Sequence, residues 1–153
     1  MKALLQRSKE SKVTINNKIN GKIDNGLVIF VGFTNGDNEE IINKMIDKII
    51  NLRIFEDEKG LMNLSLLDIN GSILSISQFT LYADAKKGRR PSFINALEPN
   101  ESSKLYDIFN QKLKEKNTNV QTGIFGEDMK VEIYNDGPVT IILDSDELFC
   151  SKK

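Results

Sequence analysis

The sequence contains no histidine among its 153 residues. This absence excludes a Ser-His-Asp triad and a Cys-His pair, and with them the commonest general base and the commonest transition-metal ligand of enzymes. Carboxylates could still hold Mg²⁺, but no group of them has a clear ligand spacing. Any catalysis must therefore rely on backbone groups, hydroxyls, amides, charged side chains or the substrate itself. We expect no cofactor and no metal.

Cysteine is also scarce, because Cys150 is the only one. One cysteine excludes an internal disulfide and a zinc site built from cysteines, and we interpret Cys150 as an ordinary tail residue. No apolar run approaches the roughly 20 residues of a membrane helix, and the first residues lack the apolar stretch of a signal peptide. These absences predict a cytoplasmic protein without a membrane partner.

The overall composition is that of an ordinary globular protein. Hydrophobic residues make up 39% and charged residues 28%, which is enough apolar material for one core. The net charge is −1, so any RNA binding must come from a local basic patch. We therefore treat residues 1–153 as one domain.

Hydrophobic patterning predicts more strands than helices. Asn20-Gly21 and Asn25-Gly26 are turn signals. Strands are expected at 2–7, 12–19, 26–33, 72–82, 119–125, 129–135 and 138–144, with short ones around 53–55 and 64–67.

Two main helices are expected. Asp37 and Asn38 are candidate N-caps for the first, and Pro99 suits the first turn of the second. The first has one apolar stripe: Ile41, Ile42, Met45, Ile46, Ile49 and Ile50. The second should bury Leu105, Ile108, Phe109 and Leu113. The order of elements favours an α/β or α+β-like domain with largely antiparallel, barrel-like sheets.

Ser77-Gln78-Phe79-Thr80, at the end of the predicted central strand, is the first candidate site. Strand alternation would put Ser77 and Phe79 on one face and place the amide of Gln78 beside the hydroxyl of Thr80 on the other. The alternative is an ordinary polar strand end.

Asn135-Asp136-Gly137-Pro138-Val139-Thr140 is the second candidate. By default Asp-Gly-Pro between apolar runs is a hairpin turn. Functionally, Gly137 could remove a Cβ where a ligand approaches the backbone, and Pro138 could lock that backbone. The residues alone favour a trans bond before Pro138.

Lys86, Lys87, Arg89 and Arg90 form a basic loop, the third candidate. Clustered Lys and Arg can hold phosphates. A solvated surface loop is the alternative.

Taken together, these segments resemble the D-aminoacyl-tRNA deacylase (D-tyrosyl-tRNA deacylase) family from Met1 to about Asp144, and the tail at 145–153 lies outside the match. The joint order and spacing of the motifs carry the resemblance. The matching segments are 6–7, 51–55, 62–64, 77–81, 87–93, 122–123, 125–126, 129 and 135–140.

The resemblance implies an esterase that releases D-amino acids from the acceptor 3′ end of tRNA, and also cleaves glycyl-tRNA mischarged on tRNA-Ala. It implies a homodimer whose sites lie at the subunit interface. Ser77, Gln78, Phe79 and Thr80 would form the catalytic pocket, with backbone N–H groups around the ester oxygen. Gly137-Pro138 would be a cis peptide inserted into the partner's pocket to block L side chains. Arg7 would hold this motif, and Met129 would contact substrate.

The missing histidine bears on this mechanism. A threonine hydroxyl is a weak nucleophile without a base, so we expect Thr80 to shape the pocket while the ribose 2′-hydroxyl takes part in catalysis. Three alternatives stay open: an editing deacylase for a mischarged L-amino acid, a non-enzymatic RNA-end binding module, and a Mg²⁺-dependent phosphohydrolase.

Overall fold

A five-stranded sheet in the order β10-β1-β4-β7-β8 organises the chain in a computed structural model, which describes residues 1–116 and 118–150. Its strands are β1 (Lys2–Ser8), β4 (Gly26–Gly32), β7 (Ser72–Ser77), β8 (Asn119–Thr122) and β10 (Asn135–Asp144). β1 is antiparallel to both β10 and β4, whereas β4–β7 and β7–β8 are parallel pairs. The parallel pairs require crossover connections, and the two main helices supply them.

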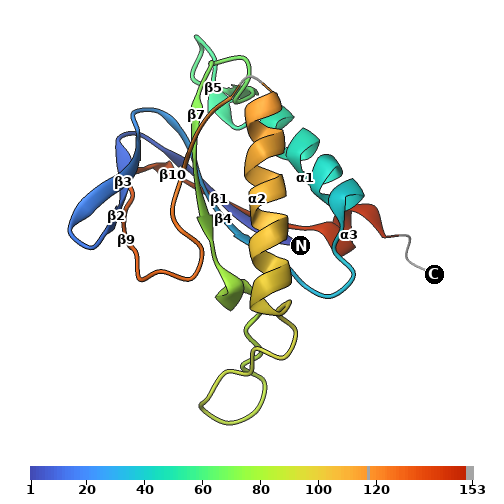
Figure 1. Cartoon of the computed structure of the whole chain (residues 1–153). Helices are drawn as coiled ribbons and strands as arrows, with labels where there is room; N and C mark the ends of the chain where they lie inside the picture. Colours follow the sequence, from blue (N-terminus) through green and yellow to red (C-terminus); the bar gives the residue numbers. More distant parts are fainter. Residues whose placement is uncertain (117, 151–153) are drawn as a thin grey trace.

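Helices α1 (Glu39–Asn51) and α2 (Pro99–Glu115) pack on one face of this sheet (Figure 1). The opposite face carries a smaller sheet of β3 (Lys18–Ile23), β2 (Ser11–Ile15) and β9 (Lys130–Glu132). A two-stranded ribbon, β5 (Phe55–Glu56) with β6 (Met62–Leu64), and the short α3 (Ser145–Phe149) complete the elements. The expected α/β class with two main helices is confirmed, and no closed barrel forms within the described ranges.

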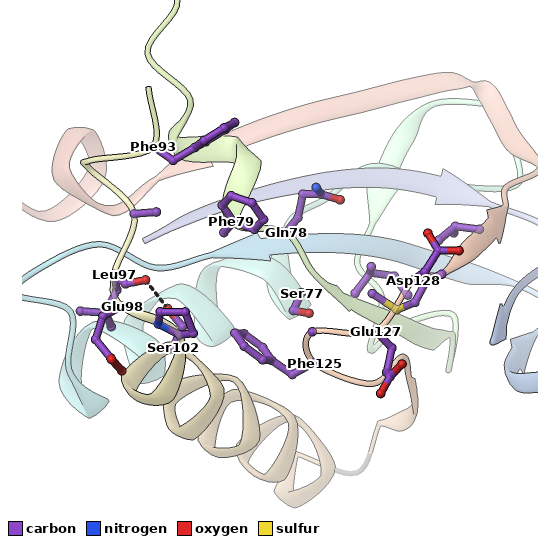
Figure 2. Close-up of a pocket in the computed structure, with 16 residues that line it drawn as sticks. Ser77, Gln78, Phe79, Phe93, Leu97, Glu98, Ser102, Phe125, Glu127 and Asp128 are labelled. Carbon is purple, nitrogen blue, oxygen red and sulfur yellow. Dashed lines mark hydrogen bonds between the residues drawn. The ribbon is translucent and has the colours of Figure 1, made fainter. Parts of the chain in front are cut away.

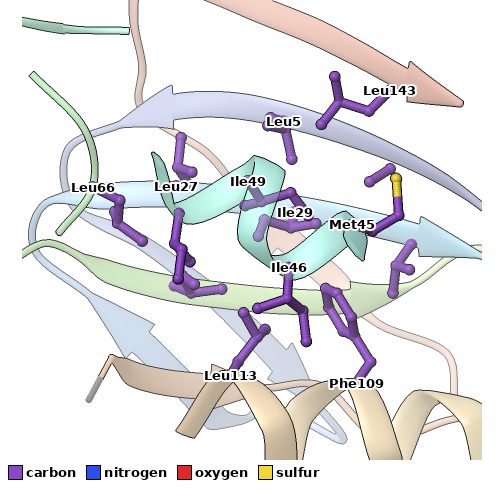
Figure 3. Packing of buried hydrophobic residues seen from close by; sticks show 14 of the residues in the cluster. Leu5, Leu27, Ile29, Met45, Ile46, Ile49, Leu66, Phe109, Leu113 and Leu143 are labelled. Carbon is purple, nitrogen blue, oxygen red and sulfur yellow. The ribbon is translucent and has the colours of Figure 1, made fainter. Parts of the chain in front are cut away.

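The main core lies between the sheet and the two helices (Figure 3). Apolar side chains from three sources interdigitate there: Leu5, Leu27 and Ile29 from the sheet, Met45, Ile46 and Ile49 from α1, and Phe109 and Leu113 from α2. A second cluster, which includes Val13, Val28 and Ile76, joins the two sheets. The five-stranded sheet is therefore covered on both faces over β4 and β7.

The signals for helix α1 and the start of α2 are confirmed. The Asn38 side chain caps α1 by accepting the Ile41 N–H at 3.0 Å, while Asp37 instead binds the Met1 amino group at 2.7 Å. The apolar stripe of α1 is buried except for half-buried Ile41. Pro99 is the first residue of α2.

The face that α2 buries was predicted only in part. Phe109 and Leu113 are buried as expected, whereas Leu105 and Ile108 are half-buried and Tyr106 lies in the core. No helix in the described part of the chain is both long and apolar enough to cross a membrane.

Three predicted turns and strand ends are wrong. The strand at 12–19 is two strands, and its turn lies at Asn16-Asn17, both with positive φ, while Asn20-Gly21 is inside β3. The strand at 72–82 stops at Ser77 and continues as a 3₁₀-helix, η1 (Phe79–Tyr82). The Asp136-Gly137-Pro138 turn belongs to β10, because β1 and β10 pair past a bulge between Gln6 and Ser8.

Two isoleucines test the account of the core. Ile49 is 0% exposed and Ile19 is 57% exposed. Ile49→Ala should lower the free energy of unfolding by about 2–5 kcal/mol, because it removes buried apolar surface and leaves a cavity. Ile19→Ala should cost less than about 1 kcal/mol. Urea unfolding followed by circular dichroism measures both, and equal losses would contradict the packing described.

Candidate functional site

A cavity of about 590 Å³ lies beside the carboxyl end of β7 (Figure 2). Its walls come from three segments that are distant in the sequence: the end of β7 with η1, the start of α2, and the loop before β9. The lining residues are Ile76, Ser77, Gln78, Phe79, Phe93, Ala96, Leu97, Glu98, Pro99, Ser102, Phe125, Gly126, Glu127, Asp128, Met129 and Val131. Most of them are apolar, so the cavity suits a flat or apolar ligand with few polar groups.

The change from strand to 3₁₀-helix brings three of the four motif residues into this cavity. The Gln78 N–H continues the parallel ladder by donating to the Val31 carbonyl at 2.8 Å, after which the chain turns and the Leu81 N–H donates to the Gln78 carbonyl at 3.3 Å. Strand alternation therefore ends at Ser77, and Ser77, Gln78 and Phe79 all line the cavity.

Thr80 is exposed and is not one of the lining residues. The Gln78 side-chain amide donates a hydrogen bond to the Thr80 hydroxyl. The Gln78 amide and the Thr80 hydroxyl are therefore adjacent, as expected, but the helical turn brings them together rather than strand alternation.

Two aromatic rings border the cavity. The rings of Phe79 and Phe93 meet edge to face, with centroids 5.1 Å apart and an interplanar angle of 68°. Their exposed fractions are 54% and 37%, high values for phenylalanine. Exposed aromatic surface beside a cavity is available to stack on a planar ligand.

Sequence reasoning missed the wall formed by α2. Ser102 donates to the Leu97 carbonyl at 3.1 Å (Figure 2). Glu98 caps the helix by accepting the Glu101 N–H at 2.8 Å. One turn further, the Tyr106 hydroxyl donates to the Ser75 carbonyl at 2.7 Å, and burial raises the pKa of this hydroxyl. The Tyr106 bond joins α2 to β7, whereas the Ser102 and Glu98 bonds hold the first turn of α2 and the residues just before it.

Met129 lines the cavity from the opposite side, as its expected contact with substrate requires. A Cβ on Gly123 would collide with the Met129 sulfur, so this glycine leaves the space that the Met129 side chain occupies. Phe125, from the same loop, also lines the cavity and was not a predicted site residue.

Arg7 lies elsewhere, in a second, polar cavity of about 180 Å³. Its side chain is 7% exposed, and its guanidinium donates to the Ile54 carbonyl at 2.9 Å and to the Asp136 carbonyl at 3.3 Å. The Asp136 carboxylate is 3.5 Å away and that of Glu56 is 3.8 Å away. Arg7 thus fixes the backbone just before Gly137.

The Gly137-Pro138 peptide bond is cis, and both residues are exposed. Gly137 has φ of +115°, a conformation that L side chains rarely adopt. A Cβ there would lie 2.9 Å from Arg7 Nη2 and 3.1 Å from Val139 Cγ2. Glycine is therefore required by the chain's own conformation and by its proximity to Arg7.

The cavity and the Gly137-Pro138 segment do not meet within one chain. The pairing that joins Ser77 to Val31 continues through β1 to Leu143 of β10. Pro138 lies five residues before Leu143, a rise of roughly 17 Å, and three strand spacings of about 4.8 Å separate β10 from β7. The two segments are therefore roughly 20 Å apart.

The basic loop is exposed from Lys86 to Arg90. An antiparallel bridge closes its base, with the Asp84 N–H donating to the Ser92 carbonyl at 2.7 Å and the Ser92 N–H to the Asp84 carbonyl at 2.8 Å. The chain then leads directly to Phe93, so the loop projects from the rim of the cavity near the start of α2 (Figure 1). No group of three or more acidic or cysteine side chains that could hold a metal occurs in 1–116 and 118–150.

The model of the D-Tyr-tRNA(Tyr) deacylase family matches residues 4–144. The chain belongs to this family. The resemblance inferred from the motifs is thereby confirmed.

Named relatives match this sequence over nearly the full length of the chain. D-aminoacyl-tRNA deacylase from Aquifex aeolicus is 55% identical over 148 residues, which cover 97% of this chain and 100% of that protein. The protein of the same name from Halothermothrix orenii is 52% identical over 149 residues, again 97% and 100%. The solved structure of the c-Myc DNA Unwinding Element Binding Protein superposes with a TM-score of 0.89 at 36% identity, covering 94% of this chain and 98% of that one. The whole domain is therefore shared within the deacylase family.

The hydrogen bonds of Arg7 predict a stability difference between two arginines. Arg7→Gln should lower the free energy of unfolding by about 2–3 kcal/mol, because the buried Ile54 carbonyl loses its charged donor. Arg53 also makes two hydrogen bonds, both to Asn63, but it is exposed. Arg53→Gln should therefore cost less than about 1 kcal/mol. Chemical denaturation compares the two, and a neutral Arg7→Gln would contradict the role assigned to this guanidinium.

Proposed function

We propose that this deacylase-family chain hydrolyses the ester bond of D-aminoacyl-tRNA in the cytoplasm and releases the D-amino acid and the tRNA. The observation that carries the proposal is the cavity formed on the Ser77–Phe79 segment, in a chain whose relatives of 50–55% identity are named D-aminoacyl-tRNA deacylase. An aminoacyl ester is already reactive, so positioning and charge stabilisation supply enough catalysis without histidine.

The acceptor end of tRNA fits the chemistry of the cavity. A terminal adenosine offers a flat base for the Phe79 and Phe93 rim, and base–aromatic stacking contributes about 1–3 kcal/mol per base. The Phe79 N–H makes no hydrogen bond within residues 1–116 and 118–150, so it is available to the ester oxygen. A backbone donor aimed at a developing oxyanion contributes about 10²–10³ in rate.

A second copy of the chain completes this site. Gly137-Pro138 lies roughly 20 Å from the cavity of its own chain, but it is exposed on the edge strand β10. The sheet face opposite the helices also carries apolar surface at Leu4 and at Ile142, which is 69% exposed. We infer a symmetric dimer in which each chain inserts Gly137-Pro138 into the cavity of the other.

Such an insertion would distinguish D- from L-aminoacyl substrates with backbone atoms alone. The rigid segment excludes volume on one side of the substrate Cα, so many D side chains are accepted and L side chains are rejected. Glycine has no side chain to exclude, and glycyl-tRNA, including that mischarged on tRNA-Ala, is therefore also a substrate. Arg7 serves by holding Asp136, the residue before this segment.

Hydrolysis of matched substrates tests the proposed function. D-aminoacyl-tRNA should release its amino acid at least about 100-fold faster than the L-enantiomer, because a steric clash of a few kcal/mol corresponds to such a ratio. Glycyl-tRNA should be cleaved, and a chelator should have no effect. Preferred release of an L-amino acid would establish the related editing activity instead. Binding without release would establish an RNA-end binding module, and loss of activity in chelator would favour a metal-dependent hydrolase.

The catalytic hydroxyl is expected on the substrate. The Thr80 hydroxyl accepts a hydrogen bond from Gln78, lies outside the cavity lining and has no histidine to deprotonate it. Thr80→Ala should therefore keep the single-turnover rate within about tenfold, whereas tRNA ending in 2′-deoxyadenosine should bind but react at least about 100-fold more slowly. An acyl group trapped on Thr80, or normal cleavage of the deoxy substrate, would overturn this mechanism.

The basic loop is expected to dock tRNA rather than to perform chemistry. Neutralising Lys86, Lys87, Arg89 and Arg90 together should raise KM more than it lowers kcat. The slope of log affinity against log salt concentration should also become shallower, by roughly 0.7–0.9 for each phosphate that the loop no longer neutralises. The matched control neutralises four exposed helical lysines: Lys44, Lys48, Lys104 and Lys114. Equal salt slopes in both variants would show that the loop is a solvated surface that does not bind tRNA.

A further inference from the structure

Gly32, the last residue of β4, lies directly against the turn that forms the catalytic segment. It is buried, and its pairing partner in β1 is Lys2. A Cβ built on Gly32 would lie 2.7 Å from the Gln78 carbonyl oxygen, 3.4 Å from Leu81 Cβ and 3.5 Å from the Tyr82 ring. These three nearest neighbours all belong to Gln78 and the helix η1 that follows it, so the missing side chain leaves room for this segment.

The shortest of these approaches involves backbone and cannot be relieved by a rotamer change. Real Cβ atoms essentially never approach another heavy atom within 3.0 Å, so an alanine at position 32 must displace the Gln78 carbonyl. Movement of the whole turn away from Gly32 is opposed at both ends. The Gln78 N–H is bonded to the Val31 carbonyl at 2.8 Å, and Tyr82 is 8% exposed. Rotation of the Gln78–Phe79 peptide is the response that leaves both ends of the turn in place, and it disturbs the 3.3 Å hydrogen bond that the Gln78 carbonyl accepts from the Leu81 N–H.

The Gln78 carbonyl and the Phe79 N–H are the two ends of one planar peptide group. In a trans peptide they point in opposite directions, so rotating the carbonyl rotates the N–H by the same angle. The carbonyl oxygen lies on the side of Gly32, 2.7 Å from the position of an added Cβ. The N–H on the other side belongs to Phe79, which lines the 590 Å³ cavity.

We propose that Gly32 is a positioning residue for deacylation, which sets the direction of the Phe79 N–H toward the cavity through the Gln78–Phe79 peptide plane. The proposal rests on the proposed function, in which this N–H stabilises the developing oxyanion. It assigns a catalytic consequence to a residue on a neighbouring strand that touches no substrate. A misplacement of about 1 Å at a reacting centre can cost about 100-fold in rate.

Gly32→Ala and Gly21→Ala form a matched pair for the test. Gly21 is also buried in a strand, and its added Cβ would be crowded at 3.1 Å from Gln121 Cβ and 3.2 Å from the Thr122 carbonyl, residues that do not line the cavity. Single-turnover hydrolysis of D-aminoacyl-tRNA should slow by about 10- to 100-fold in Gly32→Ala, with the half-saturating enzyme concentration changed less than about threefold. Gly21→Ala should keep the wild-type rate. Equal rates in the two variants would overturn the proposal.

The Phe79 amide resonance supplies a readout that general destabilisation does not move. The chain has 8 Phe residues, so labelling with ¹⁵N-phenylalanine gives few amide signals. The Phe79 amide signal should shift strongly in Gly32→Ala and stay in place in Gly21→Ala. An unshifted signal, or a shifted signal with a normal rate, would contradict the proposal. If the wild-type protein releases no D-amino acid, the proposed function fails, while the amide signal still decides whether Gly32 orients Phe79.

Wild-type protein keeps the test decisive if Gly32→Ala does not fold. A peptide group held against Gly32 should be rigid, with a Phe79 amide order parameter near about 0.85, whereas a value below about 0.6 would show that nothing fixes its direction and would overturn the proposal.

Discussion

The pairing of β1 with both β10 and β4 fixes where each functional segment lies. Because β4 also pairs with β7, one continuous register runs from the edge strand β10 to the strand that ends at Ser77. This register puts Gly137-Pro138 and the 590 Å³ cavity at opposite ends of the sheet. Packing of α1 and α2 on one face makes the arrangement rigid, so movement within one chain cannot bring the two segments together.

Each segment is instead shaped by a local constraint. At one end, the buried guanidinium of Arg7 holds the Asp136 carbonyl and occupies the space that a Cβ on Gly137 would need. At the other end, Gly32 admits the Gln78 carbonyl and allows η1 to follow β7 directly. Both constraints act on backbone rather than on reactive side chains. Backbone groups are among those that remain for catalysis in a protein without histidine.

The sequence predicts those helices and strands whose positions depend on local hydrophobic periodicity. The stripe and Asn38 cap of α1, the start of α2 at Pro99, and most strands follow from spacing and capping. The end of β7 cannot be predicted from spacing, because Gly32 on a different strand makes room for the turn. The α2 wall of the cavity was also missed, since only tertiary packing brings it to β7. The cis bond before Pro138 was expected from the family resemblance alone, because the residues by themselves favour trans.

Subunit complementation tests most directly whether two chains build each site. Ala96→Trp should block the cavity, and Gly137→Ala should distort the inserted segment, so neither variant alone should hydrolyse D-aminoacyl-tRNA. After the two are unfolded and refolded together, half of the dimers should be mixed, and each mixed dimer would combine one intact cavity with one intact Gly137-Pro138. Recovery of about a quarter of the wild-type activity is the predicted result. No recovery, with mixed dimers shown to be present, would contradict a site shared between chains.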